Sequence, residues 1–373
     1  TAGGPITILA SNESDIDALT GSVATTISAT SGSVAIGANV AVAVAENAVG
    51  THVTAGIRNS VVGSSLGAVD IDAQSNTTVE AVTFAASVGV SGSSSVAGSF
   101  SGAGARATNT ITGATLAAIE AGSDVDAPGN VTVDAADSSS ITSHVVSGSV
   151  SIGGSSSVAL SLGISVTLAE NIIAGTTSAL IADSDVASST GWVGLSAIST
   201  NTIDAVAVAA SANIAGSGSF SLAGAGAGAR AVNTTTNETT ALVSGSTMNA
   251  LAPAGTVSVT ATDTSSITSD VVSASASIGA SGSAALSISI AVTLAENSIG
   301  GTTLASIDGS SVESTGAVTV SAMADNTIDA LAAAIGVSIS GSGSFSLAGA
   351  GTRARAVNAQ TNPGESANGA GSG

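Results

Sequence analysis

The chain has 373 residues, a length that allows one or two globular domains with a sizeable interior. Its formal net charge is −20, from 25 acidic and five basic residues, so a nucleic-acid partner is excluded because little could neutralise phosphates. Hydrophobic residues make up 44% of the chain and charged residues only 8%, a composition that predicts an ordered protein and not a disordered one. Cysteine is absent, which excludes disulfides and thiolate metal sites.

The chain begins without a basic segment followed by an apolar run, so no signal peptide is predicted in residues 1–20. Ser, Thr and Gly interrupt every apolar run before it reaches 18 residues, so no transmembrane helix is predicted either. We expect a fragment of a mature protein, with no membrane insertion.

Apolar side chains alternate with small or polar ones along several segments, which is the period of a β-strand. In chain order, the clearest of these segments are residues 40–44, 158–168 and 286–294. One face of each carries Val, Leu and Ile, and the other carries mainly Ala, Ser, Gly and Thr. We expect the large apolar face to pack in the interior and the small-residue face to be flat and exposed.

A second kind of strand begins at Phe220 and Leu222 and continues with Gly224, Gly226 and Gly228 at the positions of large residues. Glycine inside a strand often marks the close approach of a neighbour. When the two kinds of strand are aligned, these glycines stand opposite the large residues of the other kind. We therefore expect large and small side chains to alternate from layer to layer.

Shorter strands are predicted at residues 255–261 and 317–322, after polar turns. Residues 359–373 contain Pro363 and end in Gly, Ser and Ala, so we expect a tail or linker there. The repeat array itself is predicted to span residues 1–358.

Three sets of residues recur along the chain at a common spacing, which is the signature of a repeat protein. Acidic markers recur at intervals of 124 and 126 residues: Glu46, Glu170 and Glu296. Basic markers recur at intervals of 124 and 125 residues: Arg106, Arg230 and Arg355. An asparagine follows each marker, at intervals of 62, 62, 62, 64 and 61 residues: Asn47, Asn109, Asn171, Asn233, Asn297 and Asn358.

The chain is thus three units of about 125 residues, each made of two half-units of about 62 residues. A single unit could not bury its strands alone, whereas stacked repeats could. These observations predict an all-β, wide repetitive β-solenoid in which each half-unit forms one coil or a small whole number of coils.

The sequence of residues 232–261 resembles the repeats of giant bacterial filamentous adhesins of the haemagglutinin-like and leukotoxin type. The segments that carry the resemblance are Val232-Asn, Thr-Thr-Ala-Leu-Val-Ser-Gly-Ser and Gly-Thr-Val-Ser-Val-Thr-Ala. The resemblance is one of the general character of the repeats and not of a diagnostic motif, and it covers nearly the whole chain. It implies an extended β-solenoid stalk and a secreted, cell-surface or fibre-forming role.

The repeated residues are predicted to form ladders along the solenoid axis. If half-units stack in register, each Arg marker lies one layer away and two residues diagonal from a Glu marker, within reach of a salt bridge. Stacked asparagines are expected to hydrogen-bond along the axis. Acidic residues on a further column are expected to be solvated, with calcium binding as the alternative: Asp17, Glu80, Asp204 and Asp329.

No catalytic or phosphate-binding motif is present, and His52 and His144 occupy unrelated positions in the repeat. We therefore expect a non-catalytic structural segment of an extracellular adhesin stalk or filament, with no cofactor. Its expected partners are further copies, end to end or lateral, or covalently linked repeats. The alternatives are a module that binds calcium, glycans or ice and, as a weaker one, an outer-membrane β-barrel.

Overall fold

The computed structural model describes residues 1–251, 255–361 and 365–369 of the chain. Within these ranges every regular element is a β-strand, and consequently none of the described segments is a helix that could cross a membrane. The predicted all-β repetitive solenoid is confirmed. The number of coils per half-unit, which the sequence left open, is one.

Each of the first three coils contains two long strands and one short strand. The strands of the first coil are β1 (Ile6–Ala29), β2 (Val34–Arg58) and β3 (Val61–Gly63). Those of the second are β4 (Val69–Ser93), β5 (Val96–Glu120) and β6 (Asp124–Ala127). Those of the third are β7 (Val131–Ser155), β8 (Val158–Ala182) and β9 (Asp185–Ser188).

In the last three coils the first long strand is divided in two. The fourth coil is formed by β10 (Val193–Ser199), β11 (Thr202–Ser217), β12 (Phe220–Ser244) and β13 (Thr247–Ala250). The fifth is formed by β14 (Val257–Asp263), β15 (Ser266–Ser281), β16 (Ala284–Asp308) and β17 (Ser311–Ser314). The sixth is formed by β18 (Val318–Ala324), β19 (Thr327–Ser342), β20 (Phe345–Thr361) and β21 (Glu365–Gly369).

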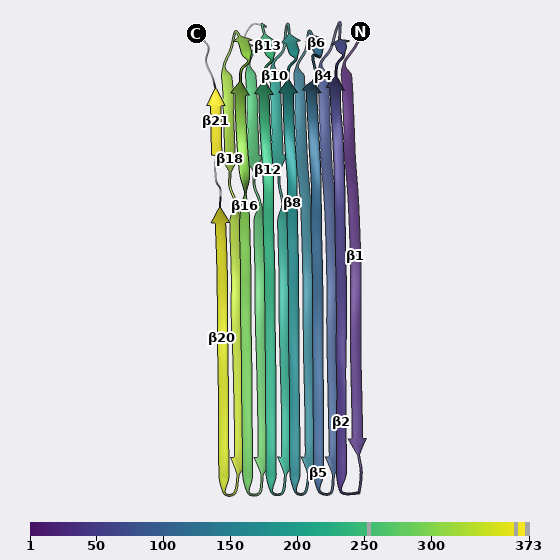
Figure 1. Cartoon of the computed structure of the whole chain (residues 1–373), viewed down its shortest axis with the longest axis vertical. Helices are drawn as coiled ribbons and strands as arrows, with labels where there is room; N and C mark the ends of the chain where they lie inside the picture. The colour runs from purple at the N-terminus through teal and green to yellow at the C-terminus, as the bar shows by residue number, and fades with distance from the viewer. Residues whose placement is uncertain (252–254, 362–364, 370–373) are drawn as a thin grey trace.

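Equivalent strands of successive coils pair in parallel and form three sheets. The β1 sheet contains the first long strands, the β2 sheet contains the second long strands with β21, and the β3 sheet contains the short ones. The two long sheets run the length of the molecule, while the β3 sheet lies at the upper end in Figure 1. We call the opposite end, where β1 turns into β2, the lower end.

The molecule is much wider along its strands than along its solenoid axis (Figure 1). A strand of 25 residues, such as β8, spans about 80 Å at about 3.3 Å per residue. Six coils spaced by about 4.8 Å advance only about 24 Å from the first to the last. The repeat therefore produces a thin blade whose two broad faces are the outer surfaces of the β1 and β2 sheets.

The expectation about which side chains fill the interior was wrong. Leu168 is 40% exposed on the outer face of the β2 sheet, and its neighbour Ala169, 2% exposed, points between the sheets. Short side chains allow the two sheets to approach closely, so that hydroxyl groups bond across the interior, as between Ser147 and Ser165 at 2.6 Å. The large aliphatic side chains of the lower half consequently lie outside.

The interior changes its composition along the strands. Near the β3 sheet it is filled by large apolar side chains, including Ile71, Ile119, Leu195 and Met248. A layer of Ile and Val crosses the middle, and an alanine-rich cluster fills the lower half. Only the upper part therefore resembles an ordinary hydrophobic core.

The segment predicted as a tail lies partly inside the array. Residues 359–361 belong to β20, and β21 pairs in parallel with residues Thr303–Ile307 of β16. Pro363 and residues 370–373 lie outside the described residues. The sixth coil therefore continues the repeat beyond residue 358.

Candidate functional site

The six asparagines of the predicted column form one hydrogen-bonded ladder between the sheets. They occupy equivalent positions because successive strands pair without a shift; Asn171, for example, stands between Asn109 and Asn233. The side-chain amide nitrogens of the first five asparagines each donate to the amide oxygen one coil further on, at 2.8 Å in four steps and 3.0 Å in the last. Asn109, Asn171 and Asn233 are fully buried. The ladder has a direction, from the first coil toward the sixth.

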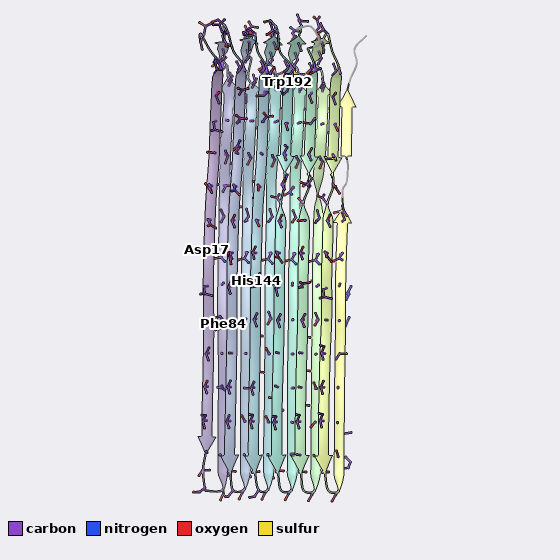
Figure 2. All side chains as sticks on the ribbon, turned by 180° about the vertical axis from the view of Figure 1, so that it is seen from behind. Asp17, Phe84, His144 and Trp192 are labelled. Carbon is purple, nitrogen blue, oxygen red and sulfur yellow. The ribbon has the colours of Figure 1, made fainter. Side chains whose placement is uncertain are left out.

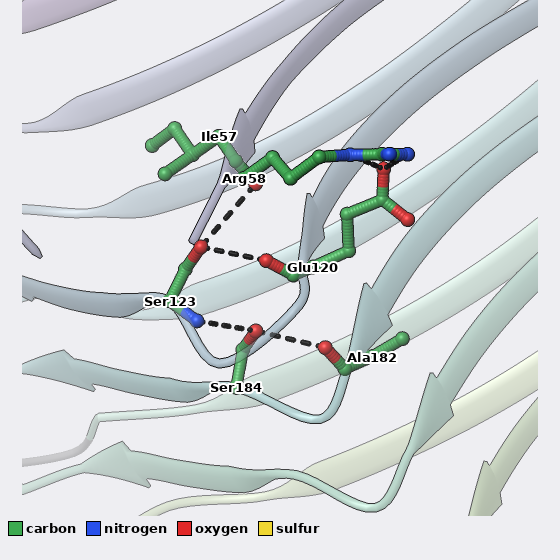
Figure 3. Close-up of polar contacts among 6 residues, drawn as sticks. All are labelled: Ile57, Arg58, Glu120, Ser123, Ala182 and Ser184. Atoms are coloured by element: carbon green, nitrogen blue, oxygen red, sulfur yellow. Dashed lines mark hydrogen bonds and ion pairs between the residues drawn. The ribbon is translucent and has the colours of Figure 1, made fainter. Parts of the chain in front are cut away.

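A second ladder, which the sequence analysis missed, is formed by serines at the upper turn. In Figure 3 the hydroxyl of Ser123 donates to the backbone carbonyl of Glu120, and the backbone amide of Ser123 donates to the hydroxyl of Ser184 at 3.2 Å. The same amide-to-hydroxyl bond links the turns from Ser60 to Ser310.

The sequence carries a signal for this serine ladder. A residue with positive φ precedes each serine, and Asn, Asp and Gly adopt that conformation more readily than other residues. These residues are Asn59, Gly122, Asp183, Gly245 and Gly309. An Asn, Asp or Gly followed by Ser at the half-unit spacing would have predicted the turn.

The Arg and Glu markers lie on the outer face of the β2 sheet. Arg106 contacts Glu170 at 3.5 Å, and Arg230 contacts Glu296 at 2.5 Å. Both pairs join an even coil to the following odd coil, and their side chains are one third to one half exposed. Among the ion pairs of the described residues, Glu46 and Arg355 have no partner within the chain.

A third ion pair was not predicted, because Arg58 lies outside the repeated marker column. It joins Arg58 at the end of β2 to Glu120 at the end of β5 (Figure 3). This pair lies at the upper turn, where the Arg side chain is 72% exposed.

Below the Arg and Glu markers, the outer face of the β2 sheet alternates between ridges and grooves. Odd coils present large side chains there, such as Ile164, which is 61% exposed. At the level of Ile164 even coils present glycine, so that Gly226 lies in register between Ile164 and Ile290. Nearer the lower end even coils also carry large side chains, such as Phe220 and Leu222. The predicted alternation of large and small residues from layer to layer is therefore present, but on the outside of the molecule.

The outer face of the β1 sheet is polar above and apolar below. Figure 2 shows Asp17 above His144 and His144 above Phe84, with Trp192 near the upper end. Asp17 and Glu80 are in-register neighbours in the column predicted as an acidic stripe; Asp204 and Asp329 lie in that column too. Threonines occupy the intervening coils, so the acidic column is interrupted.

An apolar groove of about 440 Å³ crosses the lower part of the β1 sheet along the solenoid axis. Its floor is made of small residues in the second to fifth coils, including Gly148, Ala210 and Ala274. Ile335 and Val337 line it in the sixth coil. The groove holds no charged side chain.

Three carboxylates are close together on the upper part of the β1 sheet. Asp72 and Asp134 are in-register neighbours, and Thr132 donates to Asp70 at 2.9 Å. Burial, reinforced by the charges of Asp72 and Asp70, raises the pKa of Asp134 to about 6. Burial also raises the pKa of Asp72, with Asp70 adding to the effect. This cluster therefore repels itself when ionised.

Two further carboxylates point into the molecule. Asp263 is 3% exposed and accepts a hydrogen bond from Ser265 at 2.7 Å. Asp137, at the equivalent level two coils earlier, accepts a bond from Ser139 at 3.2 Å, and burial raises its pKa. Both aspartates are held by a serine two residues later, which is a local structural arrangement.

The described residues contain no group of three or more His, Cys, Asp or Glu side chains that could hold a metal ion. A groove of about 750 Å³ crosses the β2 sheet and is lined by His52, Glu238 and several Thr and Gly residues. His144 lies on the opposite sheet, so the structure does not bring the two histidines together.

Comparison with known proteins gives no family assignment. No protein-family model matches the chain, and no curated protein or solved structure matches it significantly. The parallel pairing of equivalent strands in successive coils defines the class of the protein as a repetitive parallel β-solenoid.

Proposed function

We propose that this chain is a non-catalytic structural segment of an extracellular adhesin stalk or filament, which extends by stacking coils end to end. The single observation that carries the proposal is the axial ladder of asparagines, because the groups that it presents in the first and sixth coils are complementary. The resemblance of the repeat sequences to those of filamentous adhesins supports the extracellular location.

The terminal coils expose side chains that are buried in the middle of the blade. Ala354 and Ala356 of β20 point toward the interior side of the strand but are exposed. Their counterparts two coils earlier, Ala229 and Ala231, are 4% and 0% exposed. A further coil stacked on the sixth would bury these positions and pair the strand edges, which readily template association.

The two ends carry matching polar groups. Within the described part of the chain, the Nδ2 group of Asn358 has no acceptor and the Oδ1 atom of Asn47 has no donor. Arg355 and Glu46 stand two residues diagonal to each other across such a junction, as Arg230 and Glu296 do within the chain. An odd coil placed on the sixth coil would thus continue both ladders with the same direction.

The junction can be tested by charge reversal. Arg355→Glu and Glu46→Arg each place like charges at the junction, which we expect to weaken end-to-end association by about 3- to 30-fold. An equimolar mixture of the two variants restores opposite charges at every junction and should recover association. Lengths of rods in negative-stain electron micrographs and sedimentation velocity would measure this.

Recovery in the mixture requires head-to-tail contact, because a general loss of stability would persist there. Rods that do not lengthen with concentration in the unmodified protein, or variants that associate as the unmodified protein does, would overturn the proposed junction. A compact monomer that instead binds calcium or a glycan would favour the ligand-binding alternative.

A further inference from the structure

We infer that the lower outer face of the β2 sheet pairs with the same face of a second copy, with the ridges of each lying in the grooves of the other. This lateral contact adds to the proposed structural role and rests on it only for its biological purpose. The contact itself depends on the ridge face, which we define as the outward residues of each β2-sheet strand from the level of Gly224 to its Arg or Glu marker.

The ridge face exposes large aliphatic side chains that nothing in the chain covers. Ile164, Ile290 and Val166 are 61%, 52% and 40% exposed, and each has further aliphatic neighbours along its strand. Contiguous exposed apolar patches on soluble proteins mark surfaces of interaction. The ridge face is therefore an interaction surface and not a random scatter of apolar residues.

Two glycines of the fourth-coil groove, Gly226 and Gly228, are not required by packing within the chain. A Cβ atom added at Gly228 would meet no atom within 4 Å, and one added at Gly226 would meet only ordinary contacts, the nearest at 3.6 Å from Ile164. Glycine nevertheless weakens a strand, because it loses more conformational freedom and contributes no side chain. The open space beside these glycines therefore favours a partner outside the chain.

A second copy has the spacing that fits this surface. Ridges recur every two coils, about 9.6 Å apart, on any copy of the chain. A two-fold axis parallel to the strands, between the third and fourth coils, reverses the coil order and keeps each position along the strand. Every odd coil then faces an even coil: Ile164 lies opposite Gly226 of the second copy, and Ile290 lies opposite Gly102 of the second copy.

Charge and area agree with this arrangement. In the first five coils the charged side chains of this face lie at its upper boundary, where Arg106 and Arg230 form pairs. Arg353 takes the place of Gly228 in the sixth coil, so that at this level the second and fourth coils alone provide grooves. From the level of Gly224 to the markers the face measures about 26 Å by about 29 Å, or about 750 Å² per copy, which is close to the size of about 800 Å² per partner in a typical stable interface.

A lipid surface explains these features less well. A fluid acyl layer requires no matching two-coil spacing, and valine in place of glycine would increase its apolar contact. The glycine rows favour a rigid, complementary surface, which a second copy provides.

The test fills the grooves in the full chain. Gly226→Val combined with Gly228→Val adds side chains where space is open, and valine favours a strand, so the coil should persist. The matched control is Gly148→Val on the β1 sheet, where an added Cβ also meets nothing within 4 Å. All samples carry Arg355→Glu so that end-to-end stacking is weakened, and circular dichroism checks the strand content.

We expect the groove-filled protein to dimerise about tenfold more weakly or worse in sedimentation equilibrium, while the control stays within about twofold of its parent. Equal dimerisation of both would overturn the inference. So would flotation of the protein with phosphatidylcholine vesicles that increases when the grooves are filled, because this result would indicate lipid as the partner.

The two proposals fail in different ways. End-to-end stacking changes the length of rods along the solenoid axis, whereas lateral pairing doubles the blade in thickness at constant length. Micrographs of the groove-filled protein without Arg355→Glu should show long, single blades. Long blades that remain double would contradict only the lateral contact, and short double blades would contradict only the stacking.

Discussion

Asn171 donates its side-chain amide to the side-chain oxygen of Asn233 at 2.8 Å, with both residues completely buried between the sheets. Each of these amides also bonds to the coil on its other side. A shift of one residue in any strand would turn its asparagine outward and leave two buried partners unsatisfied. The ladder therefore fixes the register of six coils whose Ala and Ser residues could otherwise pack in several registers.

Replacing Asn171 by alanine should be strongly destabilising. The substitution removes two hydrogen bonds and leaves the buried donor of Asn109 and the acceptor of Asn233 without partners, which should cost about 2–4 kcal/mol. Urea unfolding followed by circular dichroism would measure the change in midpoint. Asn76→Ala, at an exposed position of β4, is the control and should cost less than about 0.5 kcal/mol. Equal losses at the two positions would argue against an internal ladder.

Because small residues fill the interior and large aliphatic residues lie outside, substitutions at two adjacent residues should have opposite effects on stability from those expected for an ordinary core. Ala169→Leu forces a large side chain between closely spaced sheets and should destabilise by about 1–3 kcal/mol or more. Leu168→Ser removes a large apolar side chain that is 40% exposed and should cost less than about 1 kcal/mol. Unfolding is compared at low protein concentration, where association contributes least. The opposite order of effects would mean that Leu168, and not Ala169, lies in the core.

The repeat was sufficient to predict the fold, because the asparagine column recurs once per coil and successive strands pair without a shift. It was not sufficient to predict which face lies inside. Alternation distinguishes the two faces of a strand, but both faces of these strands are nearly free of charged residues. The charged residues that usually identify the exposed face are therefore too few to do so here. Size suggested that Val and Leu belong in the core, whereas close approach of two sheets favours Ala and Ser.

A signal for the correct orientation was nevertheless present in the sequence. Arg106 and Arg230 lie on the same face as the large aliphatic residues, and an arginine is rarely buried without a partner. The asparagines lie on the opposite face, with the small residues, and buried ladders explain a repeated amide better than a solvated surface does. The exposed ion pairs and the internal asparagine ladder thus both indicate that the small-residue face lies inside. The short strands predicted at residues 255–261 and 317–322 correspond to β14 and β18, whereas the division of β10 from β11 was not predicted, because no Pro or Gly marks it.

The ion pairs of the β2 sheet should contribute little to the stability of a single blade. Arg230→Ala removes the contact with Glu296, but the two side chains are about one half and one third exposed and water replaces the interaction, so the expected cost is about 0–1 kcal/mol. The loss should diminish further at high salt, because exposed charges are screened. Urea midpoints at two salt concentrations would measure it. A cost that approaches that of Asn171→Ala would mean that the pair is far less hydrated than its exposure indicates.

The acidic cluster of the β1 sheet predicts a dependence of stability on pH. The pKa of Asp134 is raised to about 6 in the folded protein by burial and by the charges of Asp72 and Asp70, above the value of about 3.9 for an unfolded aspartate. The folded state thus binds this proton more tightly, and its stabilising contribution, present below about pH 4, is lost as the pH rises through about 6.

Asp134→Asn should therefore stabilise the protein at pH 7 by about 1 kcal/mol, a value that allows for solvent screening of this half-exposed group, and should have little effect at pH 4. The free energy of unfolding is compared with that of the unmodified protein at each pH, so that the other carboxylates cancel. Asp270→Asn is the control on the same outer face, because neither of its in-register neighbours, Val206 and Leu331, is a carboxylate. The Asp134 variant should lose its advantage gradually between pH 7 and pH 4, and the control should not follow that course. An advantage of Asp134→Asn that is equal at both pH values would show that removing the charge is not its cause.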